Sequence, residues 1–187
     1  ASEDLAQKQQ HLGEDQAHLT VLAQDTQGYH NLMKLVSLAH FEGFHYKPRI
    51  DEKHLFEHAN GLIILTGCMN GVFARLIRNH HFDKAKEMLD RYHQVFDDRL
   101  YVEIQNHFLP EQKELNHELI TLARQHGLPL VATNDVHYLE ADDAEAQDAL
   151  LAVGTRKLIS DPGRLSMLNT PEYYLKSPSQ MSEIFSE

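Results

Sequence analysis

The feature that most constrains the fold of this sequence is an alternation of short apolar segments with longer amphipathic ones. The short segments are rich in Val, Ile and Leu and are only four to six residues long, which predicts buried β-strands. They cover residues 18–23, 62–65, 100–105 and 129–133. Strands that alternate with helices are typical of an α/β fold, in which parallel strands are joined by crossover helices.

Segments with apolar residues at helical spacing separate the strands. They predict helices over residues 28–42, from an N-cap at Asp51 to near 61, and over 71–78, 83–96, 110–126 and 141–153. Residues 170–176 are a further strand candidate, and Ser177-Pro178 is typical of a helix start. Four parallel strands cannot close a barrel, which takes about seven or eight. The sequence therefore predicts either an open α/β sheet or part of a larger barrel.

Composition limits the function classes. The 187 residues contain a single cysteine, Cys68, which excludes an internal disulfide framework and fits a reducing compartment. The net charge of −11 argues against this chain being the main grip on a nucleic acid. No apolar run approaches the ~20 residues of a membrane span, so we expect no membrane partner. The polar first ten residues resemble neither a signal peptide nor a transit peptide.

Metal-capable side chains collect where the predicted strands end. Cys68 follows the second strand by three residues, Glu103 and His107 lie at and beyond the end of the third, and Asp135 and His137 follow the fourth. Because ligands of parallel α/β folds bind at the carboxyl ends of the strands, these groups could meet at one edge. Thiolate and imidazole suit zinc, and an added carboxylate permits two bridged ions or manganese.

Each of these residues also has an ordinary structural interpretation. Cys68 could be a small buried apolar residue, and Asp135 could cap the next turn. Glu103 could point outward from its strand or pair with an arginine, and His107 could be a solvated loop residue. The residue types alone leave both interpretations open.

Histidine is unusually frequent, with 14 in the chain, but most of these residues are expected at the surface. His80 and His81 precede Asp83, a candidate helix cap, in a polar connector. His54 and His58 are spaced as a helical metal pair but lack the glutamate of a zinc-protease motif, so we expect them to be exposed. The sequence contains no glycine-rich phosphate loop, nucleophile elbow or Cys-x-x-Cys motif.

Several multi-residue blocks, in order along the chain, resemble the PHP (polymerase and histidinol phosphatase) domain of bacterial DNA polymerase III alpha subunits, which are C-family polymerases. The most specific is the block of residues 131–138, VATNDVHY. The other blocks are residues 18–23, 28–35, 41–44, 47–51, 66–68, 103–107, 110–113 and 173–177.

The resemblance implies a distorted (βα)7 barrel, present here in part, with a trinuclear zinc or manganese site. In some lineages that site removes nucleotides from DNA in the 3′–5′ direction. Carried over to this chain, His18, Cys68, Asp135 and His137 match metal ligands, and Asp135 and His137 are the candidate catalytic residues. Glu103 and His107 would orient the substrate or support the ligands. The family's earlier ligands, among them a His-x-His, have no counterpart, so we expect an incomplete metal site.

The resemblance also predicts how the chain is divided. Residues 1–17 would be a polar lead, 18–176 the C-terminal part of the PHP domain, and 177–187 the start of a connection toward the polymerase palm. The parent protein would be a cytoplasmic, magnesium-dependent, DNA-directed DNA polymerase. Its partners would be the rest of the polymerase chain, DNA, and possible sliding-clamp and proofreading subunits.

Two other functions compete with a metal-dependent nuclease. One is a non-catalytic scaffold that docks the polymerase body or a separate proofreading exonuclease. The other is a small-molecule phosphoesterase of the histidinol-phosphatase type, against which the blocks at 47–51 and 173–177 count.

Overall fold

The computed structural model describes residues 16–186, so the predicted polar lead lies almost entirely outside the described residues. The chain divides into two compact units, which are described separately below. Among the described residues, unit 1 comprises 16–103 and 119–131, and unit 2 comprises 104–118 and 132–186. None of the helices in the described residues is long and apolar enough to cross a membrane.

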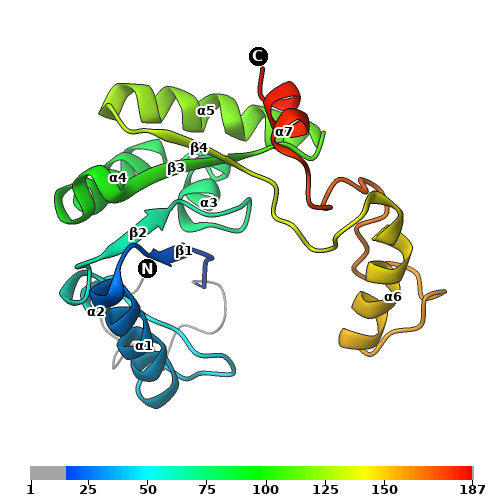
Figure 1. Ribbon diagram of the computed structural model, residues 1–187, viewed down its shortest axis with the longest axis horizontal. Helices are drawn as coiled ribbons and strands as arrows, with labels where there is room; N and C mark the ends of the chain where they lie inside the picture. Colours follow the sequence, from blue (N-terminus) through cyan, green and yellow to red (C-terminus); the bar gives the residue numbers. More distant parts are fainter. Residues whose placement is uncertain (1–15, 187) are drawn as a thin grey trace. The chain divides into compact units, whose positions relative to one another are not determined.

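The sheet contains four strands in the order β1-β2-β3-β4 (Figure 1). The strands are β1 (Thr20–Ala23), β2 (Leu62–Leu65), β3 (Leu100–Gln105) and β4 (Leu130–Thr133). Strands β2 and β3 are parallel, with Ile64 opposite Leu100. The alternation of strands with helices confirms the predicted α/β class.

Strand β1 departs from the predicted parallel arrangement, because it pairs antiparallel with β2. Two helices separate these strands, α1 (Thr26–Phe41) and α2 (Glu52–Glu57). A single crossover helix brings the chain back to the level where the preceding strand began, so the next strand runs parallel. The two helices here bring it back to the level where β1 ends, so β2 runs antiparallel to β1. The Gln24 amide at the end of β1 accordingly donates to the Gly61 carbonyl just before β2, at 2.8 Å.

The remaining helices follow the predicted segments closely. They are α3 (Val72–Arg78), α4 (Phe82–Phe96), α5 (Pro110–His126), α6 (Ala144–Gly154) and α7 (Pro178–Ile184), with short 3-10 turns η2 (Asp97–Arg99) and η3 (Ala141–Asp143).

The predicted helix caps are partly confirmed. The Asp51 side chain accepts from the His54 amide at 2.9 Å, and Ser177 caps α7. Asp83 is not the cap of α4, because that helix begins at Phe82. Residues 170–176 are not a strand, and among the described residues they contribute only the isolated bridge between Tyr138 and Tyr174.

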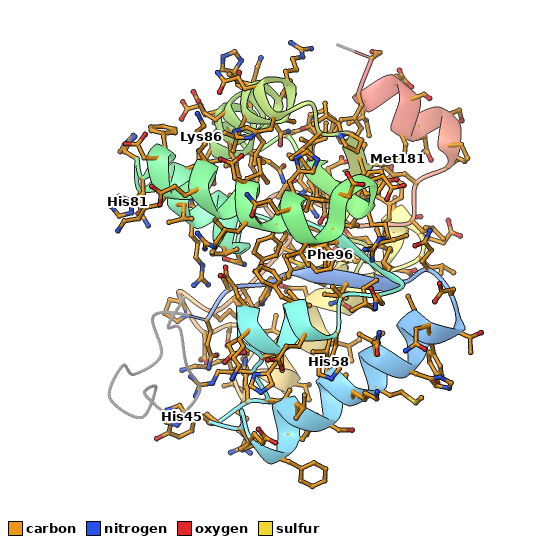
Figure 2. The ribbon with its side chains drawn as sticks, turned by 90° about the vertical axis from the view of Figure 1, so that its left-hand side faces the viewer. His45, His58, His81, Lys86, Phe96 and Met181 are labelled. Carbon is orange, nitrogen blue, oxygen red and sulfur yellow. The ribbon has the colours of Figure 1, made fainter. Side chains whose placement is uncertain are left out.

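The core of unit 1 forms around the two central strands. Leu62, Ile64 and Leu100 are fully buried, and Phe96 of α4 is buried with them. Figure 2 shows Phe96 within the unit and His81 projecting away from it. Aromatic contacts also stabilise this core. The rings of Tyr92 and Phe56 meet edge to face, with their centres 5.1 Å apart.

The outer strands are less buried than the sequence predicts. Leu22 of β1 is 47% exposed and Leu130 of β4 is 40% exposed. Both strands lie at the ends of the four-strand order, so each has a neighbouring strand on one side only within the described residues. An apolar run indicates a strand but does not reveal its place in the sheet.

Close backbone approach fixes the start of α1 against the turn before β2. A Cβ atom added to Gly28 would lie 1.8 Å from the Gly61 carbonyl oxygen. Gly61 itself has a φ of +70°, in the left-handed region that favours glycine. No larger residue fits at Gly28 without separating α1 from this turn.

Unit 2 has a polar interior. Its buried polar side chains are Gln105, His107, Gln112, Asn134, Asp148 and Lys176, whereas its buried apolar residues are few. The Asp148 carboxylate on α6 pairs with the guanidinium of Arg164 and accepts from the Ser166 hydroxyl at 2.6 Å. These contacts tie the segment after α6 back onto that helix.

Candidate metal site

Unit 1 brings together two of the predicted metal ligands, His18 and Cys68. The His18 amide donates to the Asn70 carbonyl at 3.1 Å, and His18 forms a bridge with Gly71. This pairing places the residues just before β1 alongside the loop that follows β2. As a result, the His18 Nδ1 atom lies 3.6 Å from the Cys68 sulfur.

Glu103 supports the loop that carries Cys68. This carboxylate is buried and accepts from the Gly67 amide at 3.0 Å and from the Thr20 hydroxyl at 3.5 Å. The Glu103 amide in turn donates to the Thr66 hydroxyl at 2.9 Å. Glu103 therefore faces the interior, and the alternative that it points outward from the strand is wrong.

Unit 2 holds the other predicted pair, Asp135 and His137, in the loop after β4. Asp135 has a φ of +46°, an uncommon backbone conformation that aspartate tolerates better than most residues. The His137 Nδ1 atom lies 2.5 Å from the Asp135 carbonyl oxygen. Because a carbonyl only accepts, this contact assigns the proton to Nδ1 and leaves the lone pair on Nε2 of the exposed ring.

His107 lies behind this loop and is 1% exposed, so the alternative that it is a solvated loop residue is wrong. Its Nε2 donates to the Asn134 carbonyl at 3.0 Å, and its Nδ1 accepts from the Gln112 amide group at 3.0 Å. Burial lowers the pKa of His107, which favours the neutral ring. Both ring nitrogens are engaged, so the geometry is that of a support for the Asp135 loop.

Sequence reasoning missed how the Asp135 loop is held. Asn134 is buried, and its side-chain amide donates to the carbonyls of Glu172 and Tyr174 at 2.9 and 2.7 Å. The Tyr173 ring stacks on His107, with ring centres 4.0 Å apart, and meets the His137 ring edge-on at 5.5 Å. No local pattern signals these contacts, because Asn134 bonds to main-chain atoms distant in the sequence.

The donor spacing of the His18–Cys68 pair fits a zinc-type ion. Typical Zn–S and Zn–N distances of ~2.3 and ~2.0 Å at a tetrahedral angle place sulfur and nitrogen about 3.6 Å apart. The His18–Cys68 separation of 3.6 Å matches this spacing. A metal-binding histidine commonly donates its other ring nitrogen to a backbone carbonyl, as His137 does.

The four predicted ligands thus occur as two pairs, one in each unit. Within residues 16–186, no group of three or more His, Cys, Asp or Glu side chains is arranged to hold a metal ion. Cys68 is half-buried, so the alternative of a fully buried apolar residue is wrong. The shared role of the four ligands stays a prediction.

The other histidines have varied surroundings. His80 and His81 are exposed, as predicted. His54 and His58 are half-buried instead of exposed, and the Nδ1 of His54 lies 2.6 Å from the Asp51 carboxylate. His58 lies beside α1 (Figure 2), where it lines a shallow cavity of about 550 Å³ together with Met33 and Phe41.

Comparison with known proteins identifies the family. The family model described as "PHP domain" matches residues 4–107. The chain belongs to the PHP domain family. The matched segment contains His18, Cys68 and Glu103, whereas Asp135 and His137 lie beyond it.

Several curated relatives of this chain are DNA polymerase III alpha subunits. The chain is 45% identical to the protein of Thermus aquaticus over 170 residues, which cover 91% of this chain and 14% of that protein. It is 45% identical to the Treponema pallidum protein, covering 93% and 15% respectively, and 41% identical to the Borreliella burgdorferi protein, covering 96% and 16%. The PHP domain chain therefore spans about one-seventh of the length of these relatives.

Proposed function

We propose that this chain is the PHP-domain segment of a bacterial DNA polymerase III alpha subunit, a cytoplasmic DNA-directed DNA polymerase that uses magnesium for primer extension. The likeness to alpha subunits over 91–96% of the chain carries this proposal. We also propose that the polymerase active site lies outside this chain, in the rest of the same protein. The partners of the segment would be that remaining chain, DNA, and clamp or proofreading subunits.

We further propose that the PHP domain binds zinc or manganese and hydrolyses the 3′-terminal phosphodiester of DNA. His18, Cys68, Asp135 and His137 would hold the metal, with Nε2 as the ligand atom of His137 because its Nδ1 carries the proton. When bound, such an ion lowers the pKa of water and offsets the negative charge that develops at phosphorus. Glu103 keeps the Cys68 loop in place, and His107 keeps the Asp135 loop in place.

The test uses the full-length product of the gene that encodes this chain. Primer extension and release of a 3′-terminal labelled nucleotide are measured with and without zinc or manganese, for the wild type and for Asp135→Asn. We expect Asp135→Asn to reduce nucleotide release at least tenfold and to leave primer extension unchanged. Absence of primer extension contradicts the polymerase assignment, and metal-independent or unaltered nucleotide release contradicts the nuclease assignment.

A non-catalytic scaffold is the second candidate, because Glu103 and His107 are both buried and both hold loops through hydrogen bonds. A scaffold that docks the polymerase body or a proofreading subunit predicts that Asp135→Asn leaves metal content and nucleotide release unchanged. Metal analysis of the purified wild type and variant separates the two functions.

A further inference from the structure

We propose that Asn134 is a positioning residue that clasps the main chain of residues 172–174 against the Asp135 loop and thereby fixes the His137 ring for metal binding. This inference rests on the proposed metal site and concerns unit 2 alone. Asn134 itself would not touch the metal or the substrate.

The clasp begins with the side-chain amide of Asn134. Its two N–H bonds reach the carbonyls of Glu172 and Tyr174, which lie on either side of Tyr173. One buried side chain thus binds the backbone on both sides of Tyr173. The Asn134 Oδ1 atom is buried without a hydrogen-bond partner in the described residues, so the donors of this amide are what hold the segment.

The gripped segment then fixes His137. The Tyr173 carbonyl, held between the two gripped carbonyls, accepts from the His137 amide at 2.8 Å and from the Tyr138 amide at 3.4 Å. The Tyr173 amide donates back to the Tyr138 hydroxyl at 3.3 Å. Hydrogen bonds in both directions, backbone to backbone one way and backbone to side chain the other, therefore couple Tyr173 to the loop that carries His137.

Ring contacts complete the arrangement. The Tyr173 ring lies parallel to His107 within 19° and nearly perpendicular to His137, at 86°. The His137 ring therefore meets the half-buried Tyr173 ring on one side, and its Nδ1 is bonded to the Asp135 carbonyl. Partners that orient metal ligands in this way typically contribute 10- to 100-fold to metal affinity.

The test compares Asn134→Ala with a matched control, Asn116→Ala, in the 187-residue chain. Asn116 also uses its side-chain amide to hold a backbone carbonyl in unit 2, that of Gln105 at 2.7 Å, but it does not contact the Asp135 loop. The Kd for Co²⁺ is measured by absorption spectroscopy. We expect Asn134→Ala to raise the Kd 10- to 100-fold and Asn116→Ala to change the Kd less than twofold.

Amide hydrogen exchange in the metal-free chain gives an independent readout. The His137 and Tyr138 amides should be protected in the wild type and in Asn116→Ala, and should lose protection in Asn134→Ala. Equal Kd values for the wild type and Asn134→Ala, or equal losses in both variants, overturn the proposal. Unprotected His137 and Tyr138 amides in the wild type overturn it even where Asn134→Ala does not fold.

The same data separate this inference from the proposed function. A wild type that binds no Co²⁺ contradicts the metal site, and the clasp is then judged by amide protection alone. If the wild type and Asn134→Ala bind Co²⁺ equally tightly, the proposed metal site is supported and the positioning role of Asn134 is contradicted.

Discussion

At the scale of single residues, one hydrogen bond determines what His137 can do. The bond from its Nδ1 to the Asp135 carbonyl selects the tautomer whose Nε2 lone pair is available. His107 is the same residue type with both nitrogens engaged inside unit 2. Identical side chains therefore have different chemistry because their local acceptors and donors differ.

Asp148 gives a prediction about pH. Hydrogen bonds from Arg164 and then Ser166 lower the pKa of this carboxyl from 3.8 to about 2. The pKa of Asp148 is lower in the folded chain than in the unfolded chain, so its ionised form stabilises unit 2. This contribution is at its full size above about pH 4 and is lost as the pH falls from 4 toward 2.

Amide exchange of residues 158–166 at pH 6, 4, 3 and 2 checks this prediction. Protection should fall between pH 4 and 2 in the wild type, and it should be low and nearly independent of pH in Asp148→Asn. Asp142→Asn, which changes an exposed carboxylate, should behave as the wild type does. A wild-type profile that is flat from pH 6 to 2 would contradict the role of Asp148.

Glu103 gives a prediction about stability. Glu103→Ala leaves the buried Gly67 amide without its acceptor, so we expect a loss of about 1–3 kcal/mol in the free energy of unfolding. Glu103→Gln retains a carbonyl oxygen at that position and should lose less. Urea denaturation measures both variants against Glu57→Ala, which removes an exposed carboxylate. Equal stability of Glu103→Ala and the wild type would show that this carboxylate does not support the Cys68 loop.

At the scale of elements, α1 depends on the absence of a side chain at Gly28. Gly28→Ala places a methyl group against the Gly61 carbonyl oxygen, at 1.8 Å without rearrangement, so the helix must shift. We expect a loss of at least ~2 kcal/mol in the free energy of unfolding, comparable to overpacking a core.

Gly154→Ala is the matched control for that change. Nothing lies within 4 Å of a Cβ added to Gly154, at the end of α6, so this substitution should be neutral or stabilise by up to ~1 kcal/mol. Thermal denaturation followed by circular dichroism compares the two variants. Equal melting temperatures for Gly28→Ala and Gly154→Ala would contradict the close packing of α1 on the turn before β2.

Local patterns predicted most elements, because their causes lie within the element. Both ends of α5 match the prediction, since Pro110 opens the helix and Gly127 follows it. The strands β2 and β3 also match, because continuous apolar runs mark central strands. The antiparallel direction of β1 and the exposure of β4 were not predictable, since both depend on neighbours distant in the sequence.

The same distinction applies to the candidate site. Placing polar residues at strand ends predicts Cys68 and His137 as ligands, and their positions after β2 and β4 follow directly from the order of the chain. The clasp of Asn134 has no sequence signature, since its acceptors are backbone carbonyls of residues 172 and 174. Every residue has a main-chain carbonyl, so the residue types in a sequence do not reveal which carbonyl a distant side chain will bind.

At the scale of the whole molecule, the two ligand pairs give a test of shared function. If Cys68 and Asp135 serve one metal centre, the losses in metal affinity of Cys68→Ser and Asp135→Asn will not add in the double variant. Co²⁺ titration of the wild type, both single variants and the double variant measures this coupling. Additive losses would assign the two pairs to separate ions.

The polar interior of unit 2 has a calorimetric consequence. Exposure of apolar surface raises the heat capacity on unfolding, whereas exposure of polar surface lowers it. Unit 2 buries His107, Gln112 and Asn134 where unit 1 buries Leu62, Ile64 and Phe96. Melting of unit 2 should therefore contribute a smaller heat-capacity step per residue than melting of unit 1, and its stability should vary more nearly linearly with temperature.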